Sequence, residues 1–345
     1  MKKKATMRDV AAAAGVSVMS VSYALRHHPS IPEATAERLR KLAGEMGYVP
    51  NPLVSALFGE LRSRRKSVAP PLVAYLSFYA ERSRWWNSYG ILRSYYEGAR
   101  QRCEELGFAM EVFEPNAQRM SPKRLYDILS YRNVVGVIVG VGPASMPYAF
   151  AWDRFPCVSI GYTEQVPPVH RVMLNHFQTM DETLRRVAAM GYQRIALGLL
   201  SRWRLTDNYL MALHLFQRDL PASRRIAPFY VSRYTFNGKV FGKKIAKAQP
   251  DLFIDAAGQG RFMRALQQIG VGFPRDMGYV TFNWHDRLEG LAGVNQNSDR
   301  IGATAVDLLV NQINFKESGI PDIQKFTLVS GSWVDGASAP GKVSG

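Results

Sequence analysis

The chain has 345 residues, 47% of them hydrophobic, and carries 44 Lys+Arg against 28 Asp+Glu for a formal net charge of +16. This length suits two or three domains, and the ordinary apolar fraction excludes disorder as the main state. The positive charge favours a polyanionic partner such as nucleic acid.

Cysteine usage and hydropathy exclude several further classes. The two cysteines, Cys103 and Cys157, are too few for a disulfide framework or a zinc cluster. Polar residues interrupt 7–21, so no signal-peptide core forms there, and no run approaches the roughly 20 apolar residues that span a bilayer. We therefore expect a soluble, cytoplasmic protein in a reducing compartment, with no membrane, metal or cofactor.

A basic stretch divides the chain. Residues 60–71 combine a cluster of cations with Pro70 and Pro71, which cannot continue a helix, and this indicates a linker. The segment before it is helical in pattern and more basic than the rest. We expect a headpiece over 1–50, a hinge helix and basic linker over 51–71, an α/β domain over 72–338 and a tail over 339–345.

The headpiece pattern predicts three helices. Thr6 and Asp9 form a capping-box-like start for a helix over 7–14, and Gly15 supplies a turn. Ser17 then caps a second helix over 18–25. A third helix is expected over 32–46. Two short helices joined by such a turn are typical of a helix-turn-helix unit.

A generic helical bundle has the same apolar spacing and is the alternative interpretation. Three features favour DNA binding over it: the glycine in the turn, the small polar residues of the second helix, and the surrounding cations. Ser17, Ser20 and Ser22 can approach a phosphate backbone without obstruction.

After the linker, near-continuous apolar runs alternate with amphipathic segments, which is typical of parallel sheets covered on both faces. The alternation is long enough for two doubly wound sheets. Strands are expected over 72–78, 108–114, 134–141, 156–162, 195–200, 228–232, 252–256, 278–283 and 327–334, and helices over 89–106, 123–131, 177–190, 260–269 and 301–314.

The segment after the headpiece predicts a short helix. Asn51 is a suitable N-cap and Pro52 suits the first helical position. A helix this short is marginal in water, so it needs a partner for its Leu53, Ala56 and Leu57 stripe. An ordinary interdomain helix is the alternative.

A family resemblance follows from these residues. The string TMRDVAAAAGVSVMSVSYAL at 6–25, with ATAERL at 34–39, MGYVPN at 46–51 and Leu57, resembles the headpiece and hinge of the lactose-repressor (LacI/GalR) family of bacterial transcription regulators. Looser landmarks of the family's effector domain are VGVIV, MGYQRI, QPDLFI, GYVTFN and DRIGATAVDLL, which begin at 135, 190, 249, 278 and 299. That domain is similar to periplasmic sugar-binding proteins.

The resemblance implies two lobes with a ligand cleft between them. Lobe one would comprise about 72–168 plus 300–326, and lobe two about 169–299 plus 327–338. It also implies a homodimer on a palindromic double-stranded operator, with half-sites roughly 34–36 Å apart. We expect a dimer rather than a tetramer, because the tail has no leucine heptads.

The resemblance also assigns DNA contacts. Base edges would face Val18, Met19, Ser22 and Tyr23, and phosphates would mainly face Arg8, Ser17, Ser20, Arg26, Ser30, Tyr48 and Asn51. Thr6 and Val54 complete the set, and Leu57 would wedge into the minor groove. Many family members have arginine where Tyr23 stands, so an apolar reading surface and a different operator are expected.

Candidate effector contacts lie after expected strands, where two-lobed α/β domains bind ligands. They are Tyr79, Trp85, Trp86, Asn87, Arg202, Trp203, Arg204, Asn283 and Trp284. Aromatic rings with Arg and Asn suit a sugar or sugar derivative, whereas simple domain packing is the alternative. Asn283 stands where the family often has a sugar-binding carboxylate, which puts a typical sugar in doubt.

Catalysis finds little support in the sequence. No G-x-S-x-G, H-E-x-x-H or P-loop motif occurs. The function indicated is a DNA-binding transcription regulator, most simply a repressor, that senses a small molecule and is not an enzyme. The alternative is a sugar-binding or sugar-transforming α/β protein with an accessory nucleic-acid-binding domain.

Overall fold

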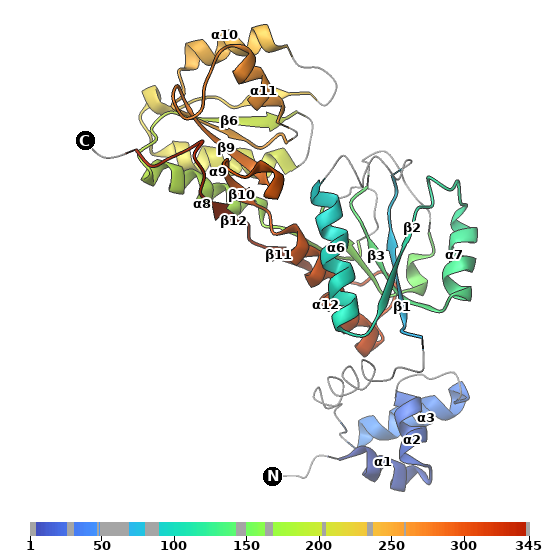
Figure 1. Cartoon of the computed structure of the whole chain (residues 1–345). Helices are drawn as coiled ribbons and strands as arrows, with labels where there is room; N and C mark the ends of the chain where they lie inside the picture. The colour runs from blue at the N-terminus through green and yellow to red at the C-terminus, as the bar shows by residue number, and fades with distance from the viewer. Residues whose placement is uncertain are drawn as a thin grey trace.

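The computed structural model describes residues 5–25, 31–46, 48, 69–79, 90–142, 150–162, 168–201, 205–232, 237–258 and 260–342 (Figure 1). Within them lie a helical headpiece and two α/β lobes, each built on a six-stranded sheet. The expected hinge helix and most of the linker lie outside the described residues.

The headpiece contains helices α1 (Met7–Ala14), α2 (Val18–Leu25) and α3 (Glu33–Glu45). The first two have the expected bounds, and the third is one residue shorter at each end. The three helices bury a small shared core of Val10, Ala11, Val21, Ala24, Ala36, Leu39 and Ala43. The helix-turn-helix prediction is therefore confirmed at the level of backbone and core.

The first lobe is built on a wholly parallel sheet of order β11-β5-β4-β3-β1-β2. Helices α6 (Gly90–Glu105) and α12 (Ser298–Phe315) cover one face, and α7 (Pro122–Tyr131) with the turn η1 (Trp152–Arg154) covers the other. The strands are β1 (Leu72–Leu76), β2 (Ala109–Phe113), β3 (Val134–Val139), β4 (Cys157–Ile160), β5 (His170–Leu174) and β11 (Phe326–Val329).

The second lobe has the sheet order β12-β10-β9-β8-β6-β7, parallel except for β12. Helices α8 (His176–Ala189) and α9 (Leu205–Arg218) cover one face, and α10 (Gly238–Ala248) and α11 (Arg261–Gln268) cover the other. The strands are β6 (Ile195–Leu200), β7 (Phe229–Val231), β8 (Leu252–Asp255), β9 (Gly278–Trp284), β10 (Ala292–Asn295) and β12 (Ser332–Val334), and the short turns are η2 (Ala222–Arg224) and η3 (Asp286–Leu288).

The lobe boundaries need two corrections. We expected 169–299 in lobe two, but β5 pairs with β4 and β11 in the first sheet. Polar His170 and charged Arg171 make this strand look like an exposed segment in the sequence, although both side chains are buried. The single strand expected over 327–334 is two strands in different sheets, β11 and β12. They are separated at Gly331, where an added Cβ would lie 2.6 Å from Cγ2 of Thr179.

The chain crosses between the lobes three times, at 174–176, 295–298 and 329–332, and we call these stretches the crossing segments. Hydrogen bonds tie them together. The N–H of Asn175 donates to the carbonyl of Val329 at 2.8 Å, and the Oγ of Ser332 donates to Oδ1 of Asn297 at 3.1 Å. Interlobe motion therefore has to act on three joined segments.

Helix α12 returns the chain to the first lobe and packs tightly on α6. Gly98 and Gly302 stand at the contact, and an added Cβ on either would collide with the backbone carbonyl of Asp299 or Tyr95. The two helices approach this closely because neither residue has a side chain.

No helix among the described residues is long and apolar enough to cross a membrane.

Candidate nucleic-acid interface and interlobe crevice

The start of α1 is held by a reciprocal cap. The N–H of Asp9 donates to Oγ1 of Thr6 at 3.3 Å, and the N–H of Thr6 donates to Oδ2 of Asp9 at 2.7 Å. Asp9 also complements the positive end of the helix dipole. This fixes the direction in which α1 enters the unit.

The turn between α1 and α2 has the expected chemistry. Gly15 has φ +66°, in the left-handed region that side chains disfavour, and the N–H of Val16 donates to the carbonyl of Ala11 at 3.1 Å. The N–H of Ser20 then donates to Oγ of Ser17 at 3.0 Å. Ser17 is therefore the N-cap of α2, and its hydroxyl faces the first turn of that helix.

The structure describes part of the expected DNA-contacting set. Thr6 and Ser17 are exposed and Ser20 and Tyr23 are half-buried. Tyr23 lies about half a helical turn from the buried Val21, so it is directed away from the headpiece core. The backbone of Arg8, Val18, Met19 and Ser22 belongs to α1 or α2 but their side chains are not described, and Arg26, Ser30, Asn51, Val54 and Leu57 lie outside the described residues.

Tyr48, another residue of the expected DNA-contacting set, packs against the headpiece core, whereas Thr6 and Ser17 are exposed. Its N–H donates to the carbonyl of Ala43 at 2.9 Å, and its ring packs against the headpiece core. Packing and a phosphate contact through the hydroxyl are compatible, because a tyrosine has an apolar body and a polar tip.

The crossing segments locate the boundary between the lobes. They leave the first sheet from the carboxyl ends of β5 and β11, and the second sheet from that of β10. The carboxyl ends of the parallel strands in both sheets therefore face the interlobe boundary. This is where open α/β sheets bind ligands.

Described groups at this edge of the second lobe include Asn283 and Trp284, which the sequence singled out. Asn283 is joined to Gln296, whose Nε2 donates to Oδ1 of Asn283 at 2.8 Å and to the carbonyl of Phe282 at 2.7 Å. The Nε1–H of Trp284 is buried and has no hydrogen-bond partner among the described residues. A buried indole N–H normally has an acceptor, so Trp284 is an exception that calls for an explanation.

The first lobe presents tyrosines at the same boundary. Tyr79 is half-buried after β1, and the ring of buried Tyr75 packs edge-on against Tyr96 at 5.4 Å between centroids. Tyr75 also lies over Gly140, where an added Cβ would approach its ring to 2.8 Å. Burial raises the pKa of Tyr95 to about 12, so the phenol stays neutral.

Two polar residues of this boundary escaped the sequence reasoning. Gln296 follows β10. That strand was not predicted, because Gly293 and Asn295 are residues typical of turns. Ser77 ends the apolar run of β1 and is 2% exposed, and its Oγ has no hydrogen-bond partner among the described residues. A polar residue that closes an apolar run was the available signal for Ser77. The other expected contacts, Trp85, Trp86, Asn87, Arg202, Trp203 and Arg204, lie outside the described residues.

Two buried ionisable groups of the second lobe, Asp255 and His176, form hydrogen bonds within the lobe. Asp255, at the end of β8, accepts from the hydroxyl of Tyr279 at 2.8 Å and from the N–H of Ala257 at 3.0 Å, and burial raises its pKa to about 6. Nδ1 of His176 and the hydroxyl of Tyr209 share a hydrogen bond of 2.8 Å, and burial lowers the pKa of His176 to about 4. The described residues contain no group of three His, Cys, Asp or Glu side chains that could hold a metal ion.

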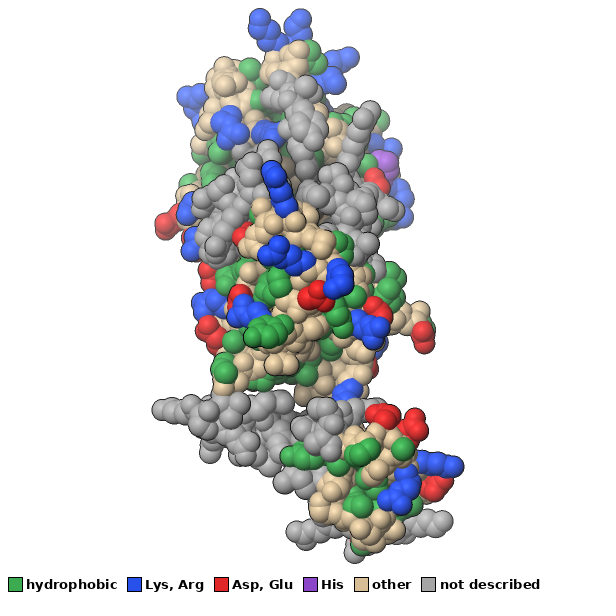
Figure 2. All heavy atoms as spheres, turned by 90° about the vertical axis from the view of Figure 1, so that its right-hand side faces the viewer, with side chains coloured by type: hydrophobic (Ala, Val, Ile, Leu, Met, Phe, Trp, Pro, Cys, Tyr) green, Lys and Arg blue, Asp and Glu red, His purple; other side chains and the backbone are tan. Residues whose placement is uncertain are grey.

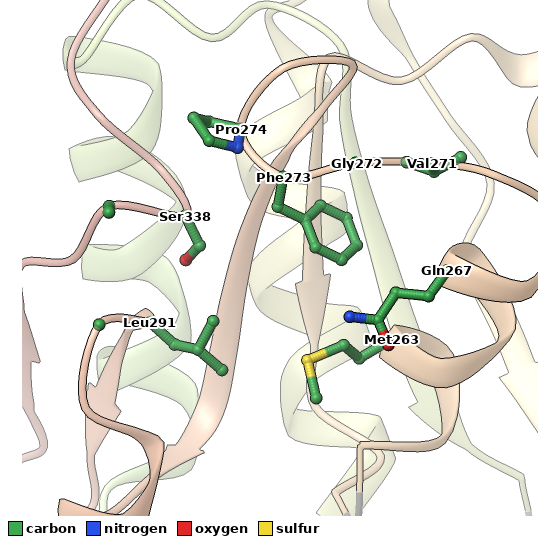
Figure 3. A pocket seen from close by; sticks show the side chains of 10 residues that line it. Met263, Gln267, Val271, Gly272, Phe273, Pro274, Leu291 and Ser338 are labelled. Carbon is green, nitrogen blue, oxygen red and sulfur yellow. The ribbon is translucent and has the colours of Figure 1, made fainter.

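A pocket of about 310 Å³ lies elsewhere in the second lobe (Figure 3). It is lined mainly by apolar side chains, with Met263 and Gln267 of α11 facing Phe273, Pro274 and Leu291. It adjoins the amino-terminal ends of β9 and β10, opposite to the interlobe edge of the sheet. It is therefore separate from the boundary between the lobes.

A capped helix-turn-helix unit followed by two α/β lobes defines a class: transcription regulators with a periplasmic-binding-protein-like domain. Comparison with known proteins supports this class. Residues 6–51 match the family model described as "Bacterial regulatory proteins, lacI family". The Escherichia coli K12 ribose operon repressor is 23% identical over 333 residues, which cover 90% of this chain and 93% of that protein. Residues 6–51 therefore form a lacI-family DNA-binding segment, and the similarity to the ribose operon repressor extends over most of the chain.

Other relatives match part of the chain. The E. coli maltose regulon regulatory protein MalI is 44% identical over 199 residues, and the Bacillus subtilis regulator DegA is 25% identical over 198 residues. The chain spans about half the length of each, 53% and 54%.

Solved structures confirm the two-lobed fold. A regulator CelR–cellobiose complex has a TM-score of 0.59 at 20% identity and covers 97% of this chain and 99% of its own. An operator-bound Lac repressor dimer has a TM-score of 0.55 at 19% identity and covers 98% and 100%. At this identity the likeness concerns the fold alone.

Proposed function

We propose that this chain is a lacI-family regulator that binds a palindromic operator as a homodimer and represses transcription, with a small molecule in the interlobe crevice changing its affinity. The observation that carries the proposal is the headpiece turn, where Gly15 and Ser17 together set the angle between α1 and α2. That arrangement suits insertion of α2 into a major groove.

We propose that the reading surface is largely apolar. Val18, Met19 and Tyr23 stand in α2 at positions that the family resemblance assigns to base edges. None of them can form the bidentate arginine contact to guanine, whereas apolar side chains contact the methyl group of thymine. The operator is therefore expected to contain A·T pairs where α2 lies.

The test is selection of bound sequences from a random duplex pool by the full chain. Enrichment of a palindrome supports the proposal, and binding without any enriched sequence contradicts it. Tyr23→Ala should shift preference at one position in each half-site. As a matched control, Phe315→Ala removes an exposed aromatic side chain of the first lobe and should leave the selected sequence unchanged.

The sheet topology supports a dimerisation edge. Because β11 and β12 are joined by two residues and form one edge of each sheet, β2 and β7 form the opposite edges on a common side. Two exposed aromatic side chains lie on this side. Tyr230 is on β7. Tyr131 is close to β2, because the next residue, Arg132, forms an ion pair with Glu111 of that strand. We propose that two copies meet along this side. Light scattering should give a dimer, and a stable tetramer would contradict the proposal.

The effector proposed for the crevice is a sugar or sugar derivative rich in acceptor oxygens. The buried N–H of Trp284 requires an acceptor, and the hydroxyl of Ser77 can serve as donor or acceptor. Ribose and cellobiose appear in the names of two relatives and are the first compounds to try. Asp255 is engaged by Tyr279 and Ala257, so binding without chemical conversion is proposed.

Thermal unfolding of the full chain with ribose, cellobiose and their phosphorylated or oxidised derivatives tests this. A bound compound should raise the midpoint, and Trp284→Phe, which keeps an aromatic ring of smaller size and removes the N–H, should reduce that shift. Trp152→Phe, the same substitution in the core of the first lobe, is the matched control. An equal shift in Trp284→Phe and the wild type would remove Trp284 from the site, and turnover of the compound would favour the enzyme alternative.

A further inference from the structure

Helix α10 of the second lobe carries an unusual row of cations. Its sequence, GKVFGKKIAKA, holds Lys239, Lys243, Lys244 and Lys247 and no acidic residue. All four lysines are exposed, and none forms an ion pair within the part of the chain that the structure describes. Lys239, Lys243 and Lys247 follow one another at intervals of four, so they form a stripe about 12 Å long on one side of the helix.

The stability of α10 does not explain this row. Phe241 and Ile245 form the buried face and would hold the helix on the sheet with other residues in place of the lysines. Like charges four residues apart on a helix repel each other. Lys239 stands in the first turn, where the helix dipole disfavours a cation. Repulsion within the row and the position of Lys239 therefore cost stability, whereas Lys247 in the last turn is favourably placed, and an anion bound along the row would relieve the cost.

The neighbouring helix continues the positive surface. The rings of Phe241 in α10 and Phe262 in α11 pack at 5.2 Å between centroids, and α11 carries Arg261 and Arg264 but no acidic residue. The intervening acids are engaged elsewhere: Asp251 accepts from Nζ of Lys342 at 2.7 Å, and Asp255 is buried against Tyr279. Figure 2 shows Lys and Arg side chains gathered at the end of the molecule where Figure 1 places α10.

We propose that this lobe-two basic face, formed by Lys239, Lys243, Lys244, Lys247 and Arg264, binds the phosphate backbone of double-stranded DNA. Phosphate contacts by Lys and Arg need no sequence and no preformed pocket. A helix face of exposed lysines provides such contacts, and the phosphates that it would contact are the same in every sequence. The face therefore takes DNA of any sequence.

The composition of the face favours DNA over an acidic protein. Lysines are depleted at protein–protein interfaces, whose energy comes mainly from buried aromatic and arginine anchors. The exposed apolar side chain of α10 is Val240, and the helix has no exposed aromatic residue. Double-stranded DNA, whose charges are dense and evenly spaced, matches such a surface better than an acidic protein does.

The location implies a second DNA segment. The headpiece joins the molecule at the first lobe, through the residues before β1, whereas α10 lies at the far end of the second lobe (Figure 1). A regulator that holds one duplex by its headpieces could then hold another by this face. The consequence is a bridge between two DNA segments without any need for a tetramer.

The experiment is a second-duplex capture assay with the full chain. An immobilised duplex is saturated with protein, excess protein is removed, and a labelled duplex of unrelated sequence is added at about 50 mM and about 200 mM salt. The test variant is Lys239→Gln, Lys243→Gln, Lys247→Gln, which keeps helix propensity and removes three charges. The matched control is Arg100→Gln, Lys123→Gln, Arg154→Gln, which removes three charges that are paired with acids in the first lobe.

We expect the wild type and the control to capture the second duplex at low salt, and the test variant to capture about tenfold less or worse, with capture lost at high salt. Loading on the first duplex should be equal in all three proteins, which separates this proposal from the proposed headpiece function. Equal capture by the test variant would overturn the proposal. If labelled polyglutamate binds through the lysines and the duplex does not, the face takes an acidic protein and the DNA assignment is wrong.

Discussion

The side-chain amide of Asn297 donates a hydrogen bond to the carbonyl of Ser330 at 2.8 Å and so joins the second crossing segment to the third. Asn297 also accepts from the hydroxyl of Ser332 at 3.1 Å, and its backbone lies in the left-handed region with φ +52°. One residue therefore supplies both the turn that begins α12 and two of the bonds that hold the crossing segments together.

Replacing Asn297 should separate these two contributions. Asn297→Ala loses both side-chain bonds and replaces asparagine, which tolerates left-handed backbone, with alanine, which does not, so the free energy of unfolding should fall by about 2 kcal/mol. Asn297→Gly loses the bonds but tolerates the backbone, and should cost about 1 kcal/mol less. Urea unfolding measures both. Equal losses in the two variants would show that the backbone conformation is not strained.

The headpiece turn can be tested with two glycines. Gly15→Ala should destabilise the headpiece by about 1 kcal/mol, because φ is +66° although an added Cβ meets no atom within 4 Å. Gly44→Ala is the matched control in α3, where an added Cβ also meets nothing, and it should stabilise by about 0.5–1 kcal/mol. Thermal unfolding by circular dichroism reports both. A neutral Gly15→Ala would contradict the proposed role of the turn.

Two buried groups should give opposite pH dependences. The folded-state pKa of His176 is lowered to about 4, so between about pH 4 and 6.5 the unfolded chain binds more protons and stability rises with pH. The folded-state pKa of Asp255 is raised from 3.8 to about 6, so over nearly the same range stability falls with pH. Each effect is about 3 kcal/mol, and in the wild type they largely cancel.

Single substitutions should reveal these effects in urea unfolding at pH 4.5 and pH 7. Relative to the wild type, Asp255→Asn should gain stability as the pH rises, because only the histidine effect remains. His176→Gln should lose stability over the same interval. Parallel pH profiles for the two variants would contradict the burial assigned to one of these groups.

The hinge assignment has a direct test although the hinge lies outside the described residues. Leu57→Ala should weaken operator binding and leave the unfolding midpoint unchanged, because the leucine is proposed to wedge into the minor groove. Fluorescence anisotropy with the selected operator measures the affinity. Leu53→Ala, on the same expected stripe, serves for comparison, and unchanged affinity in Leu57→Ala would refute the wedge.

Local signals made the headpiece predictable from the sequence. Thr6, Gly15 and Ser17 each act within a few residues of their own position, so their roles follow from short-range rules. Strand β5 could not be found in that way. His170 and Arg171 look like solvent-exposed residues, and only packing against the rest of the first lobe allows them to be buried.

The location of the expected ligand site could be predicted from the sequence. Its residues could be predicted only in part. Asn283 and Trp284 follow a strongly apolar strand, which indicated them directly. Gln296 reaches Asn283 across 13 positions, and that contact exists only once β9 and β10 pair. Whether Ser77 and Trp284 have partners depends on tertiary structure, which no local pattern encodes.

The interleaving of the lobes along the chain constrains how the protein is made. The first lobe needs α12 and β11 to cover and complete its sheet, so it cannot finish folding until residues near 329 have left the ribosome. The headpiece core is complete by residue 48 and needs nothing beyond it. During synthesis, a folded DNA-binding unit would therefore precede the domain that regulates it.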